Sequence, residues 1–487
     1  MNKGLEIPRV YGKGKENFMS EKQMRPFGIR DKMGYLLGDL GNDLTFILSS
    51  SYLMKFYTDI MGVPAAAVGV IMMIARFVDA FTDVTMGRIC DKSKATKAGK
   101  FRPWIRRMCG PVAVASFLMY QSAFAGMPMT FKIVWLFVTY ILWGSVFYTS
   151  INIPYGSMAS AISAKPEDRQ SLSTFRTVGG TLSGVFMGIL VPLIAFETVK
   201  GRTVLVGSKF TIAAGVFSVL AILCYMGCYH LTLERVKPQN VEKTEKESFG
   251  KEFADLIKKL FTNRALLSVI AAMVFMLLAQ LTVQGMNNYV YPNVYNNAGA
   301  LSLSSLLIMA VVLICAAFAK PLTSRFGRKE ISVAGSILAA GSYLVCFIIR
   351  PSNVWVYLTF AMIAYTGLML FSIMSWALIT DVIDYSEIKN GVREDGTIYS
   401  VYSFSRKLGQ AASAGLVGAL LSIAGYTAET AFEAEVVRSI FNISCIVPAI
   451  GFIAVAVIMG FLYPLNKKMV DENVRILAEK HADDERR

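Results

Sequence analysis

The chain has 487 residues, of which 54% are hydrophobic and only 17% are charged. Soluble proteins of this size are far more polar, and the long uninterrupted apolar runs argue against an outer-membrane β-barrel. Lys and Arg outnumber Asp and Glu by 49 to 34, but they gather in short connections between apolar runs, which indicates membrane topology and argues against a nucleic-acid partner. We therefore expect an all-α protein that crosses a lipid bilayer many times.

Residues 1–32 are polar and basic and lack the apolar core of a signal peptide, so we expect a cytoplasmic N-terminal tail. A membrane-spanning helix needs about 20 apolar residues. The sequence predicts twelve such spans, at residues 33–55, 67–90, 104–125, 131–156, 176–198, 208–231, 265–291, 301–321, 329–349, 353–380, 397–422 and 438–463. They form an N-terminal half (33–231) and a C-terminal half (265–463), joined by a polar central loop (232–264) and followed by a C-terminal tail (464–487).

The distribution of charge over the loops predicts the orientation. The connection after the second span and the central loop are rich in Lys and Arg, whereas residues 56–66, 292–300 and 423–437 contain none. By the positive-inside rule, we expect both termini and the central loop in the cytoplasm of a bacterium, with the spans in its inner membrane. The seven cysteines are scattered and there are only two histidines, so we expect no metal site and no cofactor.

The second span carries two carboxylates in the middle of its apolar run. Asp79 and Asp83 are one helical turn apart and share a helix face, and Arg76 lies on nearly the same face. A charge at that depth costs about 2.5–3.5 kcal/mol on insertion scales. A protein tolerates this cost where the carboxylates face water, a cation or a substrate path. The pair is therefore a candidate site for Na⁺ or H⁺.

Two other spans carry polar groups suited to a sugar or a cation. Asp43 lies deep in the first span beside Asn42, where its carboxylate can accept two sugar hydroxyls or form a salt bridge to a neighbouring helix. In the fourth span, Thr149, Asn152 and the turn that Pro154 opens supply neutral oxygens for a hard cation or a sugar hydroxyl. A purely structural kink is the alternative for the fourth span.

Two basic residues lie inside spans of different halves. Arg176 opens the fifth span, and Lys407 lies about ten residues into the eleventh. Long cationic side chains near an interface often reach out to water, but Lys407 is too deep for that. We expect it to have a partner, either an acid of the other half or an anionic group on the substrate.

Charged groups near the cytoplasmic ends predict gates. Asp381 and Asp384 end the tenth span, and we interpret them as gate ion pairs with Arg393 or with basic loop residues. Basic, glycine-containing turns follow the second and the eighth spans, and we interpret them as conformational latches rather than substrate sites. The gating candidates are Arg76, Asp91, Arg325, Asp381, Asp384 and Arg393.

Several of these segments together resemble a known family. The segments are residues 57–60, 75–83, 99–104, 152–156, 376–387 and 402–410. They are similar to the glycoside–pentoside–hexuronide:cation symporters, the relatives of melibiose permease in the major facilitator superfamily, and the similarity runs from Asp31 to Leu465. The resemblance implies a twelve-helix fold of two six-helix halves and the co-transport of a sugar with a monovalent cation.

The resemblance also implies which residues form the sites. Cation binding falls on Asp79, Asp83, Thr82, Thr149 and Asn152. Sugar binding falls on Asp43, Asn42, Tyr148, Asn152, Arg176, Ser403 and Lys407. Melibiose permease carries an acid where this chain has Asn152, and the loss of that charge favours H⁺ over Na⁺ and an anionic substrate. The runs at residues 152–156 and 403–407 look closer to the glucuronide permease branch.

The expected function is therefore secondary active transport of a glycoside or hexuronide with H⁺ or Na⁺, by alternating access and as a monomer. The sequence contains no phosphate-binding loop for ATP-driven transport and no known hydrolase motif. Two other classes stay open. One is a membrane sugar sensor without flux, and the other is an intramembrane transferase in which the Asp pair acts as general acid and base.

Overall fold

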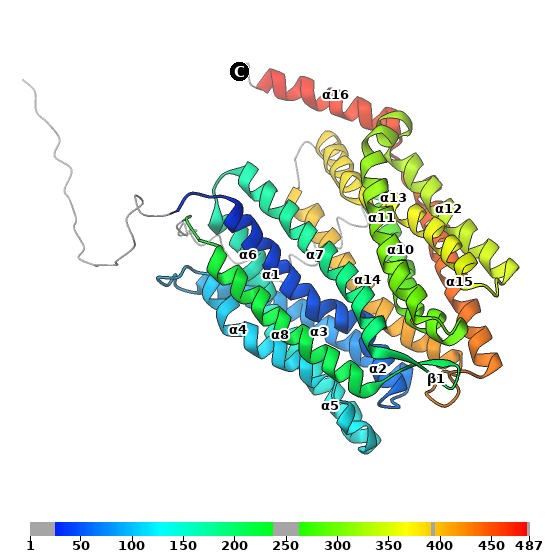
Figure 1. The fold of residues 1–487 in the computed structure, drawn as a ribbon. Helices are drawn as coiled ribbons and strands as arrows, with labels where there is room; N and C mark the ends of the chain where they lie inside the picture. Colours follow the sequence, from blue (N-terminus) through cyan, green and yellow to red (C-terminus); the bar gives the residue numbers. More distant parts are fainter. Residues whose placement is uncertain (1–24, 237–262, 391–394, 485–487) are drawn as a thin grey trace, which may run out of the picture.

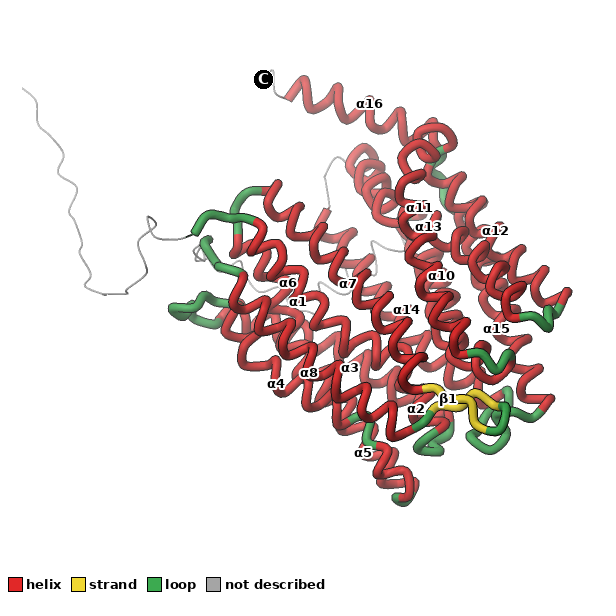
Figure 2. The backbone as a smooth tube through the Cα atoms, viewed as in Figure 1, coloured by secondary structure: helices red, strands yellow, loops and turns green. Residues whose placement is uncertain are grey.

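The computed structural model describes residues 25–236, 263–390 and 395–484. Arg393 and the amphipathic helix predicted at residues 251–261 lie outside this part of the chain. The described residues are almost entirely helical (Figure 2). Their strands form one antiparallel hairpin, β1 (Phe196–Val199) with β2 (Arg202–Leu205).

The N-terminal half begins with a helix that is interrupted by a π-helical turn. Its elements are α1 (Ile29–Ile47), the π turn η2 (Leu48–Tyr52), α2 (Leu53–Asp59), α3 (Ala65–Lys92), α4 (Arg102–Leu118), the 3₁₀ turn η3 (Ser122–Gly126), α5 (Met129–Ile141), the π turn η4 (Leu142–Tyr148), α6 (Thr149–Ile162), α7 (Pro166–Ala195) and α8 (Gly207–Leu231). The turns η2 and η4 each continue into the next helix without a loop, so α1–η2–α2 and α5–η4–α6 are each one span.

The C-terminal half also consists of long helices, two of which end in π turns. Its elements are α10 (Arg264–Tyr289) with the π turn η5 (Val290–Val294), α11 (Ala298–Phe326), α12 (Arg328–Ile349), α13 (Val354–Asn390), α14 (Asp395–Ile423), α15 (Ala434–Val457) with the π turn η6 (Ile458–Leu462), and α16 (Lys467–Asp484). The helix α16 occupies most of the segment that the sequence predicts as a tail.

The fold is all-α and membrane-spanning, as predicted. Ten helices among the described residues are long and apolar enough to cross a membrane. Two more segments, α1–η2–α2 and α14, pack among them, and they are less apolar because they carry in-span charges such as Asp43 and Lys407. This arrangement is consistent with the predicted twelve spans.

Two predicted boundaries differ from the observed ones. The helix α1 starts at Ile29, inside the predicted tail, and α7 starts at Pro166, ten residues before the predicted fifth span. Pro166 at the first helical position, followed by Glu167 and Asp168 in the first turn, is a favourable helix start. Hydrophobicity does not reveal this start because the first turns of α7 are polar.

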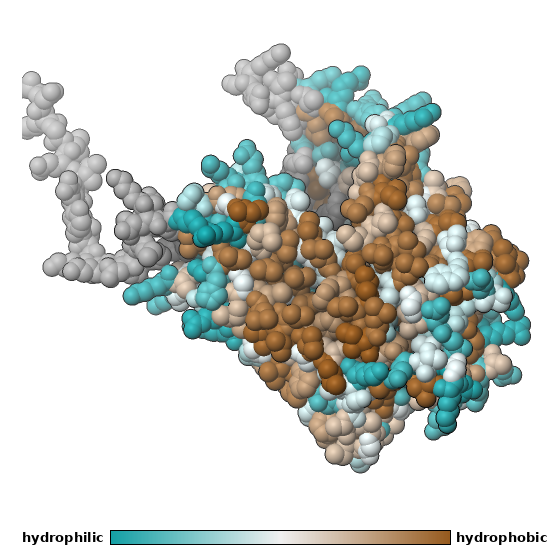
Figure 3. All heavy atoms as spheres, in the orientation of Figure 1, coloured by the Kyte–Doolittle hydropathy of each residue, from teal (hydrophilic) through white to brown (hydrophobic). Residues whose placement is uncertain are grey.

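The two halves meet near the β1–β2 hairpin, which we call the hairpin end, and diverge toward the end that carries the start of α1 and α16, which we call the termini end (Figure 1). Helix α3 packs against α14, and α7 packs against α11. A band of hydrophobic residues runs across the middle of the molecule, between more hydrophilic ends (Figure 3). This is the surface expected of a protein that lies in a bilayer.

Helices α3 and α14 cross backbone to backbone near the hairpin end. A Cβ atom added at Gly418 would lie 2.5 Å from the carbonyl oxygen of Ala65 and 2.8 Å from the Cα of Gly69. Across the other contact between the halves, a Cβ at Gly188 would lie 2.3 Å from the Ser305 hydroxyl. Glycine at these positions allows the halves to approach this closely.

A buried polar cluster also closes the hairpin end. The Lys55 ammonium donates to Asn293 Oδ1 at 2.6 Å and to the Tyr426 hydroxyl at 2.7 Å, and it forms an ion pair with Asp59. The Tyr426 hydroxyl donates to Asp59 at 2.8 Å, and the Tyr289 ring faces the Lys55 ammonium at 4.4 Å. Because Lys55 and Asp59 belong to one half and the other three residues to the other half, these contacts join the halves. We call this set the hairpin-end latch.

At the termini end, a buried acid holds the start and the end of the N-terminal half together. Asp31 is fully buried and forms ion pairs with Arg25 and Arg235. It also accepts a hydrogen bond from the backbone N–H of Leu233 at 3.1 Å. Residues 25–32 and 232–236 are therefore packed parts of the N-terminal half, although the predicted boundaries place them in the tail and the central loop.

Candidate functional site

The carboxylates of Asp79 and Asp83 both face the fourth span. Ser145 Oγ donates to Asp79 Oδ1 at 2.6 Å, and Thr149 Oγ1 donates to Asp83 Oδ1 at 2.9 Å. Ser145 lies in the π turn η4, and Thr149 is the first residue of α6. The wider π turn therefore presents two hydroxyls to two acids that are one turn apart on α3. Pro154 lies inside α6, after the irregular turn that shapes this site.

Each of these acids also has a basic partner. Arg76 Nη1 lies 3.3 Å from Asp79 Oδ2 on the same helix. Lys407 Nζ lies 2.5 Å from Asp83 Oδ2 and comes from α14, so this ion pair connects the two halves. The Lys407 side chain is 38% exposed, so this ion pair is only partly buried. Of the two predicted kinds of partner for Lys407, the structure provides the acid of the other half.

The other predicted cation ligands are arranged differently. The Thr82 hydroxyl donates to the backbone oxygen of Asp79 at 3.2 Å, within its own helix. Asn152 Oδ1 accepts from Asn42 Nδ2 at 3.4 Å, and Asn42 Oδ1 accepts from the Tyr225 hydroxyl at 2.9 Å. Asn152 therefore interacts with the first span, and the buried Asn42 already has two partners within the N-terminal half.

The predicted sugar residues Asp43 and Arg176 lie close to a third charge that was not among the predicted site residues. Arg176 Nε donates to Asp39 Oδ1 at 3.0 Å, and its guanidinium stands 5.4 Å from the Tyr155 ring centroid. A Cβ at Gly180 would lie 2.8 Å from Asp43 Oδ2, so glycine leaves room for that carboxylate. Within the described part of the chain, no hydrogen bond or ion pair engages Asp43.

Phe46 lies between the two candidate sites. The Arg76 guanidinium stands 5.0 Å from its ring centroid, and its ring stacks on Tyr148 at 5.8 Å. Tyr148 in turn lies 5.3 Å from the Trp143 ring. A single aromatic residue in an apolar span carries no sequence signal, so Phe46 was not predicted.

The side chain of Ser403, the remaining predicted sugar residue, lies outside the described residues.

Most of the predicted gating residues lie at the termini end. Asp381 forms an ion pair with Arg328, and both belong to the C-terminal half. Asp384 has interactions within the protein. Asp91 is exposed, and its backbone oxygen accepts from Lys100 Nζ at 3.1 Å.

Two gating candidates remain, and neither forms an ion pair between the halves among the residues that the structure describes. The backbone oxygen of Arg325 accepts from Lys467 Nζ at 3.1 Å, and the Arg325 guanidinium faces the Phe326 ring. Arg76 is the partner of Asp79 described above. The predicted role of Arg393 falls on a residue that the structure does not describe.

Two adjoining cavities separate the halves next to these residues. The larger has a volume of about 330 Å³ and lies between α1, α7, α10 and α11. The smaller, of about 150 Å³, lies beside Arg76, Phe46 and Gln410. Both are lined by Ile47, Ser51 and Gln284. The amide side chains of α10 in these walls were not predicted, although their helical spacing within an apolar span is visible in the sequence.

The sequence matches the family described as MFS/sugar transport protein over residues 34–467. The chain belongs to this family of the major facilitator superfamily. Members of the family are transporters rather than enzymes, so sugar transport is the activity of this chain. The described residues contain no group of three or more His, Cys, Asp or Glu side chains placed to hold a metal ion.

Two relatives of this MFS sugar transporter are named as sugar carriers. It is 31% identical over 466 residues to the isoprimeverose transporter of Lactiplantibacillus pentosus, with 95% of this chain and 93% of that protein covered. It is 30% identical over 446 residues to the glucuronide carrier protein homolog of Escherichia coli K12, with 91% and 94% covered. These relatives confirm the predicted resemblance to the glycoside and hexuronide symporters.

The fold is similar to that of a bacterial homolog of the human lysosomal transporter Spinster, solved in an inward-facing, unoccupied conformation. The TM-score is 0.61 at 11% identity, with 89% of this chain and 95% of that chain covered. At this identity the similarity shows the major facilitator fold and nothing more specific.

Proposed function

We propose that this MFS sugar transporter is a sugar:cation symporter of a bacterial inner membrane, in which Lys407 and the transported cation alternate as the counter-ion of Asp83. The observation that supports this proposal is the ion pair between Lys407 on α14 and Asp83 on α3, which joins the two halves. The protomer contains both candidate sites, so a monomer is sufficient for transport.

The charges around the acid pair balance in this conformation. Asp79 is paired with Arg76 and Asp83 with Lys407, so the four side chains are neutral together without a bound cation. When α14 moves away from α3, Lys407 moves with it and leaves Asp83 without a counter-ion. Removing one partner from a fully buried ion pair costs about 3–5 kcal/mol, and the cost is smaller here because both side chains are partly exposed. Binding of a cation or a proton offsets that cost, and this links ion binding to the movement of the halves.

The oxygen atoms around the acids suit a small hard cation or a proton. Two carboxylates and the hydroxyls of Ser145 and Thr149 converge on the space between α3 and the fourth span. Asn152 is neutral where melibiose permease carries an acid, which lowers the negative charge near the site. We therefore favour H⁺ over Na⁺ as the coupled ion.

The sugar binds beside the acid pair in this proposal. Asp43 accepts sugar hydroxyls, and Arg176, which is held by Asp39, donates to an anionic group of the substrate. A hexuronide or an anionic glycoside fits this combination, as the glucuronide carrier homolog among the relatives suggests. The contacts of Phe46 with Arg76 and Tyr148 provide a physical path between the cation and the sugar.

Alternating access then proceeds by movement of one half against the other. With both termini in the cytoplasm, the closed hairpin end faces outward and this conformation opens inward. An outside cation would bind Asp83 when the hairpin end opens, and Lys407 would expel it after closure. An inward-negative potential supplies about 2.3 kcal/mol per charge per 100 mV to this cycle.

Uptake into proteoliposomes of the purified protein tests this proposal. A panel of isoprimeverose, methyl β-D-glucuronide and other neutral and anionic glycosides is offered, with Na⁺ and pH gradients imposed separately. We expect at least one glycoside to accumulate and its accumulation to collapse when an ionophore dissipates the driving gradient. Sugar binding without any flux would overturn the proposal and favour a sensor.

A further inference from the structure

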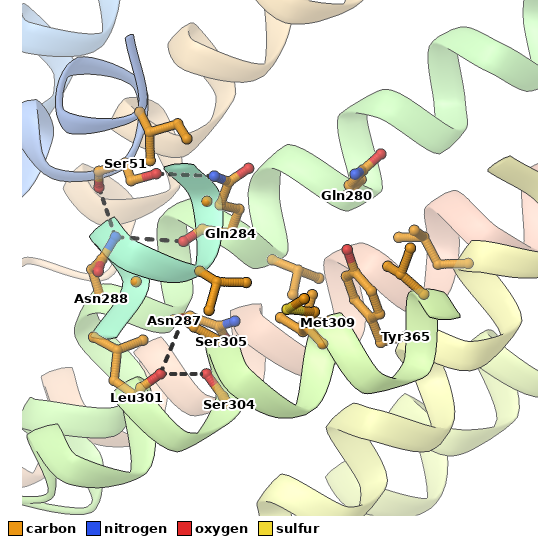
Figure 4. A pocket seen from close by; sticks show the side chains of 18 of the residues that line it. Ser51, Gln280, Gln284, Asn287, Asn288, Leu301, Ser304, Ser305, Met309 and Tyr365 are labelled. Atoms are coloured by element: carbon orange, nitrogen blue, oxygen red, sulfur yellow. Dashed lines mark hydrogen bonds between the residues drawn. The ribbon is translucent and has the colours of Figure 1, made fainter. Parts of the chain in front are cut away.

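The larger cavity differs from the neighbouring candidate sites because amide side chains line it and, among the described residues, charged ones do not. Gln280, Gln284, Asn287 and Asn288 of α10 project from one helix face at i, i+4, i+7 and i+8 (Figure 4). We call these four residues the amide row. None of the described residues that line this cavity is charged. The cavity therefore offers hydrogen bonds to a ligand without offering a counter-ion.

Half of the amide row is fixed by the protein itself. Gln284 Nε2 donates to Ser51 Oγ at 2.9 Å, and Asn288 Nδ2 donates to the Ser51 backbone oxygen at 2.6 Å. Among the described residues, no hydrogen bond engages the side chains of Gln280 or Asn287, although both line the cavity. Each free amide offers two N–H donors and one acceptor oxygen. These are the groups that pair with hydroxyls, which both donate and accept.

Several other residues that line the cavity are apolar and aromatic. Tyr343 and Phe452 stack with ring planes 1° apart, and Met309 and Tyr365 also line the cavity. The Tyr365 hydroxyl points to the same side as Gln280 (Figure 4). Ligand sites commonly combine apolar walls with a few placed polar groups in volumes of about 300–1,000 Å³. A sugar ring, with polar edges and apolar faces, fits such a space.

The cavity lies in line with the proposed sugar residues. Asp43 and Ser51 lie on α1 and in the turn that follows it, and Arg176 lies two turns before Gly184 on α7. Ser51 and Gly184 line the cavity. Eight helical residues rise about 12 Å. Gln284 bonds to Ser51, and Gln280 lies one turn of α10 nearer the termini end, which brings it closer to the level of Asp43. A second unit linked to a ring at Asp43 and Arg176 therefore extends toward Gln280.

We propose that the amide row binds a second, uncharged, polyhydroxylated unit of the transported glycoside and so selects disaccharides over simple methyl glycosides. This inference rests on the proposed sugar symport and extends it to a substrate class. In it, Arg176 and Asp43 recognise the first ring, and Gln280 and Asn287 recognise the hydroxyls of the second.

Matched ligand pairs test this proposal. The pairs are methyl α-D-xyloside with isoprimeverose, methyl α-D-galactoside with melibiose, and methyl β-D-glucuronide with a glucuronosyl-glucose disaccharide. Affinities of the purified full-length protein are measured by calorimetry, and the pair with the tighter disaccharide is carried forward. For Gln280→Leu we expect the disaccharide to bind roughly tenfold more weakly, because one to two hydrogen bonds are lost. The affinity of the methyl glycoside should stay within about twofold, since a lost contact affects only the ligand that makes it.

The controls separate the possible failures. Gln170→Leu removes an exposed amide of α7 outside the cavity and should leave both affinities unchanged. Asn287→Leu repeats the test if Gln280→Leu does not fold. Equal losses for both ligands, no loss for either, or no preference of the wild-type protein for any disaccharide would overturn the role of the amide row. If the wild-type protein binds and transports no sugar of the panel, the proposed symport itself fails.

Discussion

Lys407 has its ion-pair partner in the other half, so movement of the halves apart would separate the two. Its amine touches Asp83 of the other half, and its side chain is only partly buried. The Lys407 ammonium and a free cation compete for the same carboxylate oxygen of Asp83. The affinity of the ammonium for Asp83 depends on how close α14 stands to α3, which is the property that a coupling residue needs.

Replacing this competitor should change cation binding and transport in opposite directions. In Lys407→Met, Asp83 keeps Thr149 but loses its ammonium partner. We expect tighter binding of H⁺ or Na⁺, by about tenfold, because the partly buried Asp83 carboxylate then lacks its counter-ion. Gradient-driven accumulation should fall, since nothing expels the cation. Cation titrations followed by intrinsic fluorescence measure the first effect, and Lys94→Met at an exposed loop lysine is the control. Weaker cation binding would contradict the competitor role.

Asp79 is the acid that keeps its partners within the N-terminal half. Asp79→Asn preserves the size of the side chain and can still accept from Ser145, but it removes the charge that faces Arg76. We expect accumulation coupled to the ion gradient to be lost while the protein still inserts and still exchanges sugar down its gradient. Counterflow and gradient-driven uptake in the same proteoliposomes measure the two activities. Accumulation that still follows the ion gradient would remove Asp79 from the coupling mechanism.

The charged residues of the site could be predicted because a carboxylate or ammonium inside an apolar run stands out against its surroundings. Asp79, Asp83 and Lys407 were found in this way. Their pairing could not be predicted, because Asp83 and Lys407 are 324 positions apart and only the packing of α3 on α14 brings them together. Ser145 carried no signal, since serine is common in spans and its role depends on the π turn in which it lies.

At the scale of elements, the hairpin-end latch determines which end of the molecule is closed. It buries an ammonium and two tyrosine hydroxyls beside the partly exposed Asp59 carboxylate. The Tyr426 hydroxyl accepts from Lys55 and donates to Asp59, so it is the only group of the latch that bonds to both charges among the described residues.

Removal of that hydroxyl should favour opening of the hairpin end. Tyr426→Phe keeps the ring against Lys55 but leaves both charges with one partner fewer. We expect the conformational equilibrium to shift by about 1–3 kcal/mol away from the closed hairpin end. Spin labels at Val199 and Glu429, introduced after replacement of the seven native cysteines, report the separation of the halves there. Tyr295→Phe, a tyrosine whose hydroxyl bonds within its own half, serves as control. An unchanged distance distribution in Tyr426→Phe would show that the latch does not hold the closed state.

The extents of the elements were predicted where hydrophobicity changes sharply and missed where polar residues extend a helix. Ten predicted spans correspond to clearly apolar helices. The first turns of α7 and α1 are polar and were assigned to loops, because a helix that projects beyond the membrane has no apolar face to reveal it.

At the scale of the whole molecule, the two halves meet at one end and part at the other (Figure 1). The pairs α3 with α14 and α7 with α11 form the contact between them. Since the binding cavities lie between the halves, a ligand that touches both halves should stabilise a different relative position from the empty protein.

Labels at the termini end should record this change directly. Gln170 on α7 and Ser324 on α11 are exposed residues of opposite halves. We expect the distance between labels at these positions to shorten when both the coupled cation and a transported sugar are present, and to change less with either alone. Double electron–electron resonance in lipid nanodiscs measures the distance. A distance that ignores both ligands would contradict movement of the halves about the site.

The glycine crossing of α3 and α14 has a mechanical consequence. Gly418 is 23 residues from Asp395, where α14 begins (418 − 395). A straight helix of that length extends about 35 Å, so each degree of pivoting at the crossing swings the far tip by about 0.6 Å. A fulcrum placed so near the hairpin end lets a modest rocking motion open a wide vestibule at the termini end.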